Sequence, residues 1–123
     1  MSTKPKNRWL KEPEVHDYPA AESYLTLIQD EQTAAKFIRK LRPASVIEFK
    51  AKDIFRASGL PLLGLNNSHV KADQKKMLAG KKLSPLLLVR QPSIGRVIIA
   101  DGYHRICAAY SLDEDAWIPC KIV

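Results

Sequence analysis

The chain has 123 residues, of which 46% are hydrophobic, and this composition indicates one folded domain and excludes a disordered chain. No apolar run approaches the roughly 20 residues that a membrane-spanning helix needs, so we expect no membrane partner. The formal net charge of +7 favours phosphorylated or polyanionic partners. The first residues are polar and basic and lack the apolar stretch of a secretory signal, so we expect a cytoplasmic protein.

The N-terminal third predicts a tail followed by helices. Residues 1–16 are expected to form a basic flexible tail, and residues 17–123 a single domain. Two apolar runs, at 21–28 and 34–41, are separated by a wholly polar segment, which predicts two helices or one bent helix ended by Pro43. We interpret 17–43 as a helical extension that either covers a sheet face or pairs two chains in a homodimer.

The core, residues 44–123, alternates strand-like and helix-like patterns, which predicts an α/β (α+β) fold with a small mixed sheet and flanking helices. Gly59 and Gly80 each follow a helical pattern, as glycines at helix ends do, and Asn67 or Ser68 caps the second of these helices. Strands are expected at 46–51, 86–90, 96–100 and 116–123, and helices at 52–58, 70–79 and 103–112.

The segment Asp101-Gly102-Tyr103-His104-Arg105 joins a predicted strand to a predicted helix. The start of a helix presents backbone N–H groups without intrahelical acceptors, and the helix dipole favours an anion there. A histidine and an arginine in the same first turn are unfavourable unless an anion joins them. The turn therefore predicts a phosphate site; the alternative is a solvated surface turn.

Residues 101–109, DGYHRICAA, resemble the G-x-H-R-x-x-A signature of the ParB/sulfiredoxin-like superfamily, and small bacterial proteins of that group share the DGYHR turn. The flanking residues 83–90 and 116–123 agree with the family's strands. The resemblance implies that Gly102, His104 and Arg105 bind the phosphates of a nucleotide such as ATP, ADP or CTP. Tyr103 stands where sulfiredoxins carry their catalytic cysteine, so sulfinic acid reduction is not expected.

Within this interpretation each residue of the turn has a role. Arg105 and the backbone N–H groups after Gly102 take the phosphate charge, His104 donates to the phosphate and takes part in catalysis, and Tyr103 lines the pocket. Asp101 is the expected catalytic acidic residue and Mg²⁺ ligand; the alternative is a turn-forming aspartate. His69 either lies over the ligand or is an exposed loop residue. Phosphoryl transfer or hydrolysis stays open.

The sequence offers no motif for zinc or haem, since its three histidines and two cysteines lack metal-ligand spacing. Cys107 and Cys120 are expected to be small buried hydrophobic residues. A second interpretation of the function is a non-enzymatic nucleic-acid-binding or regulatory module that uses the basic surface. Few aromatic residues interleave with the lysines, which equally suit a solvated surface. The largest lysine cluster consists of Lys71, Lys75, Lys76, Lys81 and Lys82.

Overall fold

The structure, a computed structural model, describes residues 8–123; residues 1–7, the first part of the expected tail, lie outside the described residues. Five α-helices and four strands follow one another much as the sequence patterns predict. In chain order they are α1 (Asp17–Leu25), α2 (Glu31–Leu41), β1 (Ile47–Lys50), α3 (Ala51–Ser58), α4 (Ser68–Leu78), β2 (Leu86–Gln91), a 3₁₀ turn (Pro92–Ile94), β3 (Arg96–Asp101), α5 (Tyr103–Leu112) and β4 (Trp117–Ile122).

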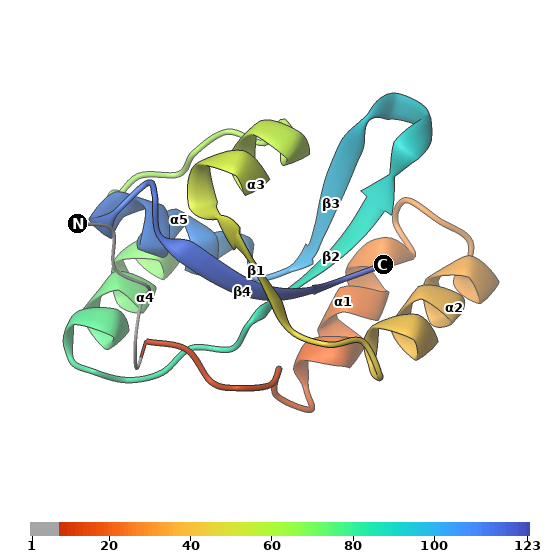
Figure 1. Cartoon of the computed structure of the whole chain (residues 1–123), viewed down its shortest axis with the longest axis horizontal. Coiled ribbons are helices and arrows are strands. Elements are labelled where there is room, and N and C mark those ends of the chain that lie inside the picture. The colour runs from red at the N-terminus through yellow and green to blue at the C-terminus, as the bar shows by residue number, and fades with distance from the viewer. Residues whose placement is uncertain (1–7) are drawn as a thin grey trace.

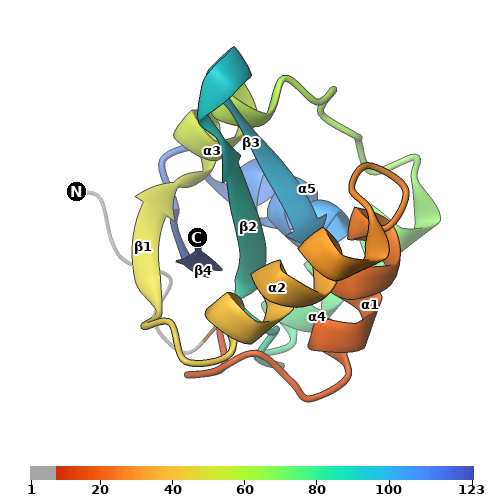
Figure 2. The same cartoon turned by 90° about the vertical axis from the view of Figure 1, so that its right-hand side faces the viewer.

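The four strands form one mixed sheet in the order β1-β4-β2-β3 (Figures 1 and 2). β4 runs antiparallel to β1 and parallel to β2, and β2 and β3 form an antiparallel hairpin. The predicted small mixed α/β domain is thereby confirmed. This order places β4 and β2 at the centre of the sheet and leaves β1 and β3 as its edges.

Helices cover both faces of the sheet. In Figure 2, α1 and α2 lie in front of the sheet, and α3 and α5 lie behind it. Side chains alternate along β2, so that Leu87 and Val89 pack with α1 and α2 while Leu86 and Leu88 pack with the other helices. The first four residues of β2, Leu86 to Val89, are buried on both faces, which explains why they form a continuous apolar run.

The segment interpreted as a helical extension is therefore part of the fold. Ala21 and Leu25 of α1 and Ile38 of α2 are buried in one cluster with the sheet, so of the two interpretations the structure shows a helical layer on a sheet face. The predicted apolar face of α1 is wrong in part. Leu27 and Ile28 are exposed because α1 ends at Leu25, before the apolar run does.

Residues 8–16, which we predicted to be part of a flexible tail, are instead docked on the domain. Trp9 is buried, and its backbone forms an isolated parallel bridge with Leu83. The Nζ of the buried Lys121 lies 3.1 Å from a carboxylate oxygen of Glu12, which ties the same segment to β4. A single tryptophan in a polar stretch is enough to dock the segment, because one buried aromatic ring removes a large apolar area from water.

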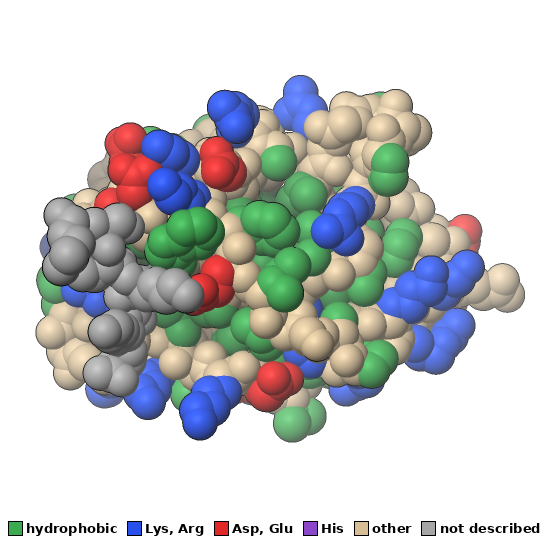
Figure 3. Space-filling model, in the orientation of Figure 1, with side chains coloured by type: hydrophobic (Ala, Val, Ile, Leu, Met, Phe, Trp, Pro, Cys, Tyr) green, Lys and Arg blue, Asp and Glu red, His purple; other side chains and the backbone are tan. Residues whose placement is uncertain are grey.

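None of the helices described here has the length and apolar character that crossing a bilayer requires. On the face shown in Figure 3, hydrophobic side chains gather at the centre, and Lys and Arg side chains form small groups around them, one at the right-hand side and one at the upper left next to acidic side chains.

Candidate functional site

The predicted strand–turn–helix is present, and its glycine is required. Gly102 has a φ of 108°, in the left-handed region, and a Cβ at this position would lie 2.7 Å from Cγ of the buried Leu86. The turn delivers the chain directly into α5, whose start has no side-chain cap. The first backbone N–H groups of α5 accordingly lack intrahelical acceptors and are available to an anion.

A pocket of about 240 Å³ lies at this turn, between the starts of α4 and α5. The rings of His69 and His104 stand side by side there, with their centroids 4.9 Å apart. Asn67 caps α4, as predicted, by accepting hydrogen bonds from the backbone N–H groups of His69 and Val70, and this cap fixes where His69 begins the helix. The pocket is lined by His69, Ala72, Asp73, Lys76, Asp101, Gly102, Tyr103, His104 and Arg105.

All five predicted turn residues and His69 thus line one pocket, but they do not do so in the same way. The hydroxyl of Tyr103 donates a hydrogen bond to the backbone oxygen of Pro61 at 2.5 Å, which ties the start of α5 to the α3–α4 loop. Partial burial raises the pKa of the Tyr103 phenol. The ring of Tyr103 lies 5.7 Å from that of His104, so Tyr103 forms a wall beside the imidazole.

Arg105 is engaged within the protein. Its Nε donates to the backbone oxygen of Ser84 at 3.0 Å, and its Nη2 donates to the backbone oxygen of Pro85 at 3.3 Å. The same Nη2 donates to Oδ2 of Asp101 at 2.7 Å. The first two bonds hold α5 against the segment that leads into β2, and the third ties it to the end of β3. We expected Arg105 to bind the phosphate charge. In the structure its guanidinium instead binds backbone oxygens and Asp101, whose carboxylate already offsets its charge.

Asp101 likewise fits its expected role as a Mg²⁺ ligand poorly. Its carboxylate faces the Arg105 guanidinium, and a cation placed there would be repelled by that charge. Burial raises the pKa of Asp101, and Arg105 lowers it by a smaller amount. Among the described residues, no group of three or more His, Cys, Asp or Glu side chains is placed to hold a metal ion. Asp101 serves the turn by fixing Arg105.

Two pocket residues, Asp73 and Lys76, were missed by the sequence interpretation. They follow His69 by four and seven positions on α4, a spacing that puts all three on one helix face. Once His69 was assigned to the pocket, this helical spacing could have identified Asp73 and Lys76 from the sequence. The Nζ of Lys76 lies 4.0 Å from Oδ1 of Asp73. The lysine therefore brings a cation to the pocket together with a carboxylate that offsets it.

The charged pairs Arg105–Asp101 and Lys76–Asp73 leave the pocket close to electrically balanced. What remains for a ligand are the N–H groups of α5, the two imidazoles and the lysine ammonium, all hydrogen-bond donors or potential donors. Such a set accepts an oxyanion. The free cysteines Cys107 and Cys120 are both buried, as predicted, and neither lines this pocket.

No family model matches the chain, and no curated protein and no solved structure is significantly similar to it.

Proposed function

We propose that this protein binds a phosphorylated ligand, a nucleotide or a phosphorylated small molecule, in the pocket between α4 and α5. The observation that carries the proposal is the uncapped start of α5, which opens into a pocket shared with His69 and His104. Phosphoryl oxygens accept hydrogen bonds from backbone N–H groups and imidazoles alike. The resemblance of residues 101–109 to the ParB/sulfiredoxin-like turn supports the same ligand class.

The size of the pocket favours recognition of the phosphoryl group itself. Its volume of about 240 Å³ is smaller than the roughly 300–1,000 Å³ of pockets that enclose a drug-sized ligand. A phosphate and the atoms next to it fit inside, and the remainder of a nucleotide would lie over the exposed surface of α4. We therefore expect weak discrimination between ATP, ADP and CTP, and measurable binding of inorganic phosphate.

In this proposal His104 is the residue suited to moving a proton, because its imidazole lines the pocket and lies next to the rings of His69 and Tyr103. Asp101 acts through Arg105, as a positioning residue. Phosphoryl transfer or hydrolysis remains a prediction that follows binding, and no step of the proposal requires a metal ion.

Binding is tested by thermal unfolding with inorganic phosphate, ADP, ATP and CTP, each with and without Mg²⁺. A ligand at 100 times its dissociation constant stabilises the folded state by about 2.7 kcal/mol. For a chain of this size that corresponds to a rise in Tm of roughly 10 °C. The informative variants are His104→Gln and Lys76→Gln. Lys75→Gln is the matched control, since Lys75 is its neighbour on α4 and does not line the pocket.

The proposal predicts that His104→Gln and Lys76→Gln reduce the rise in Tm while Lys75→Gln leaves it unchanged. Arg105→Ala is avoided because it removes three internal hydrogen bonds and would lower stability without any ligand. Equal shifts in all variants, or none with any phosphate compound at millimolar concentration, would contradict the proposal. The basic-surface alternative is then tested by salt-dependent nucleic-acid binding. Its variant reverses lysines outside the pocket, namely Lys71, Lys75, Lys81 and Lys82.

A further inference from the structure

β3 is an edge strand whose central residues carry no charged side chain. Edge strands are commonly protected by charged side chains, proline or bulges, because their unpaired N–H and C=O groups otherwise pair with another chain. The opposite edge, β1, follows this rule and carries Glu48 and Lys50. β3 carries Val97, Ile98 and Ile99 in sequence. Its one irregularity of register with β2 falls between Ile99 and Asp101, beyond these three residues.

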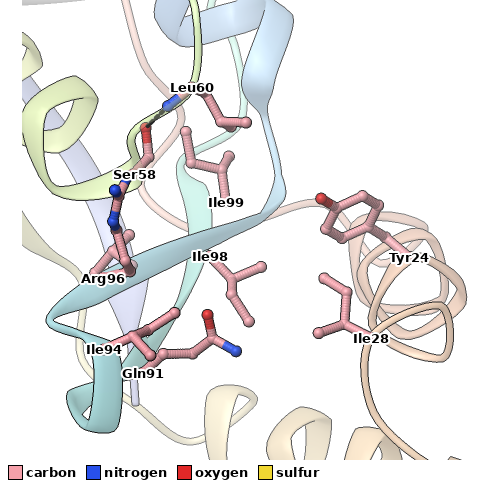
Figure 4. A pocket seen from close by; sticks show the side chains of 10 residues that line it. Tyr24, Ile28, Ser58, Leu60, Gln91, Ile94, Arg96, Ile98 and Ile99 are labelled. Carbon is pink, nitrogen blue, oxygen red and sulfur yellow. Dashed lines mark hydrogen bonds between the residues drawn. The ribbon is translucent and has the colours of Figure 1, made fainter.

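This edge forms the floor of a groove of about 450 Å³ (Figure 4). Consecutive residues of β3, from Arg96 to Ile99, line it, which is the pattern expected where a cavity follows a strand's edge and touches side chains of both faces. The two walls come from opposite faces of the sheet: Tyr24 in α1 and Ile28 after it form one wall, and Ser58 at the end of α3 and Leu60 after it form the other.

The walls combine polar and apolar side chains, and the apolar ones are exposed to solvent. Tyr24 is 40% exposed and Ile28 45% exposed, and Ile94 at the tip of the hairpin is 64% exposed. These are residues that the sequence pattern assigned to a buried helix face or left in a loop. Their exposure around a single groove differs from the scattered single hydrophobic residues that any surface carries.

One end of the groove carries a fixed positive charge. Arg96 is the single charged residue among the described residues that line the groove. Its guanidinium lies on Gly59, at the C-terminal end of α3: a Cβ built on Gly59 would stand 1.4 Å from Nη1 of Arg96. The negative end of the α3 dipole favours a cation at that place. An acidic group of a partner would find the charge already positioned.

We propose that the β3 edge is a docking site for an extended peptide segment with apolar side chains on both of its faces and one acidic side chain beside Arg96. The peptide pairs its main chain with Val97–Ile99 as a fifth strand, and its side chains pack against Tyr24 and Ile28 on one wall and Leu60 on the other. The lined stretch of four residues, Arg96 to Ile99, spans roughly 13 Å and accommodates a peptide core of about the same number of residues.

A second copy of this chain fits the groove less well. The β3 edge is recessed between its walls, so two such edges meet only after the walls of both copies have collided. Each copy also carries a formal net charge of +7, and the two copies repel each other. The same positive charge attracts an acidic peptide. The docking site is also separate from the pocket at the start of α5, with which it shares no lining residue.

The test uses a fluorescent capped peptide with a central Val-Ile-Val-Ile core, one Glu next to the core and Gly-Ser ends for solubility. Binding to the full chain is measured by fluorescence anisotropy. Two control peptides carry Lys in place of Glu, or Pro within the core, which removes a main-chain donor without reducing apolar character. The protein variants are Arg96→Glu and Ile28→Asp. Leu27→Asp is the matched control, because Leu27 is 82% exposed and lies outside the groove.

We expect the Glu peptide to bind the wild type and Leu27→Asp equally, and at least tenfold more weakly to Ile28→Asp. The Pro peptide should not bind, and Arg96→Glu should reverse the preference between the Glu and Lys peptides. Unchanged thermal unfolding of each variant shows that the fold is intact. Equal binding of the Pro peptide, or no binding at millimolar concentration, overturns the proposal. Self-association of the wild type that Ile28→Asp abolishes, without peptide binding, also overturns it and assigns the groove to a second copy.

Discussion

Gly102 provides the sharpest test of how the turn is built, through the variant Gly102→Ala. Two costs add up. An alanine at a φ of 108° occupies the left-handed region, which costs about 1–2 kcal/mol. Its Cβ would also stand 2.7 Å from Cγ of Leu86 and 3.0 Å from Nη2 of Arg105, and forcing atoms into a packed core costs about 1–3 kcal/mol. The free energy of unfolding should fall by about 2–5 kcal/mol.

The matched control is Gly80→Ala. Gly80 has a φ of 79°, and a Cβ there would meet no atom within 4 Å, so this variant pays the backbone cost alone. Chemical denaturation followed by tryptophan fluorescence and circular dichroism gives both free energies, provided that the slope with denaturant is unchanged. At roughly 4 °C per kcal/mol, the loss of Tm is about 8–20 °C for Gly102→Ala and about 4–8 °C for Gly80→Ala.

A second comparison identifies the colliding atom. In a Leu86→Ala background the Cγ that Gly102→Ala would strike is absent, so the cost of Gly102→Ala should fall towards that of Gly80→Ala, and the contact with Nη2 of Arg105 remains. If Gly102→Ala costs no more than Gly80→Ala in the wild-type background, the close packing of this turn against Leu86 is not what requires glycine, and the reasoning is refuted.

Three further predictions concern other parts of the fold. Leu25→Ala should lower the free energy of unfolding by about 2–5 kcal/mol, because Leu25 is fully buried between α1 and the sheet. Leu27→Ala should change it by less than about 0.5 kcal/mol, and equal effects of the two variants in urea unfolding would show that α1 does not pack on the core. Burial raises the pKa of the Cys107 thiol and raises that of Cys120 to about 12, so neither should react with Ellman's reagent at pH 8 until the protein is unfolded; prompt reaction of the folded protein would show an open core. Asp30 caps α2 by accepting from the Thr33 N–H, and this bond lowers its pKa below the ordinary 3.8. Its contribution to stability is therefore present above pH 3.8 and lost as the pH falls through the folded-state pKa, and Asp30→Asn should flatten the acid limb of the stability curve.

The sequence by itself determined the elements and the pocket turn, because these depend on local patterns. Alternating strands and helices, the Asn67 cap and the glycines after α3 and before α5 are each specified by residues a few positions apart. The same locality allowed the turn residues to be assigned to one site, whereas His69, far earlier in the chain, was placed there only on the resemblance, with an exposed loop residue as the alternative. The positions of Asp73 and Lys76 followed from helix periodicity but were not used.

Only the tertiary structure decided which partners these local elements take. Arg105 meets the backbone of Ser84 and Pro85 about 20 residues earlier in the chain, and such long-range hydrogen bonds leave no trace in a local pattern. The pairing of Trp9 with Leu83 was not predicted for the same reason, because the two residues are far apart in the chain. Strand order likewise depends on which faces the helices cover. This order makes β3 an edge strand, so that its main-chain edge lies in the groove although the side chains of Ile98 and Ile99 are buried.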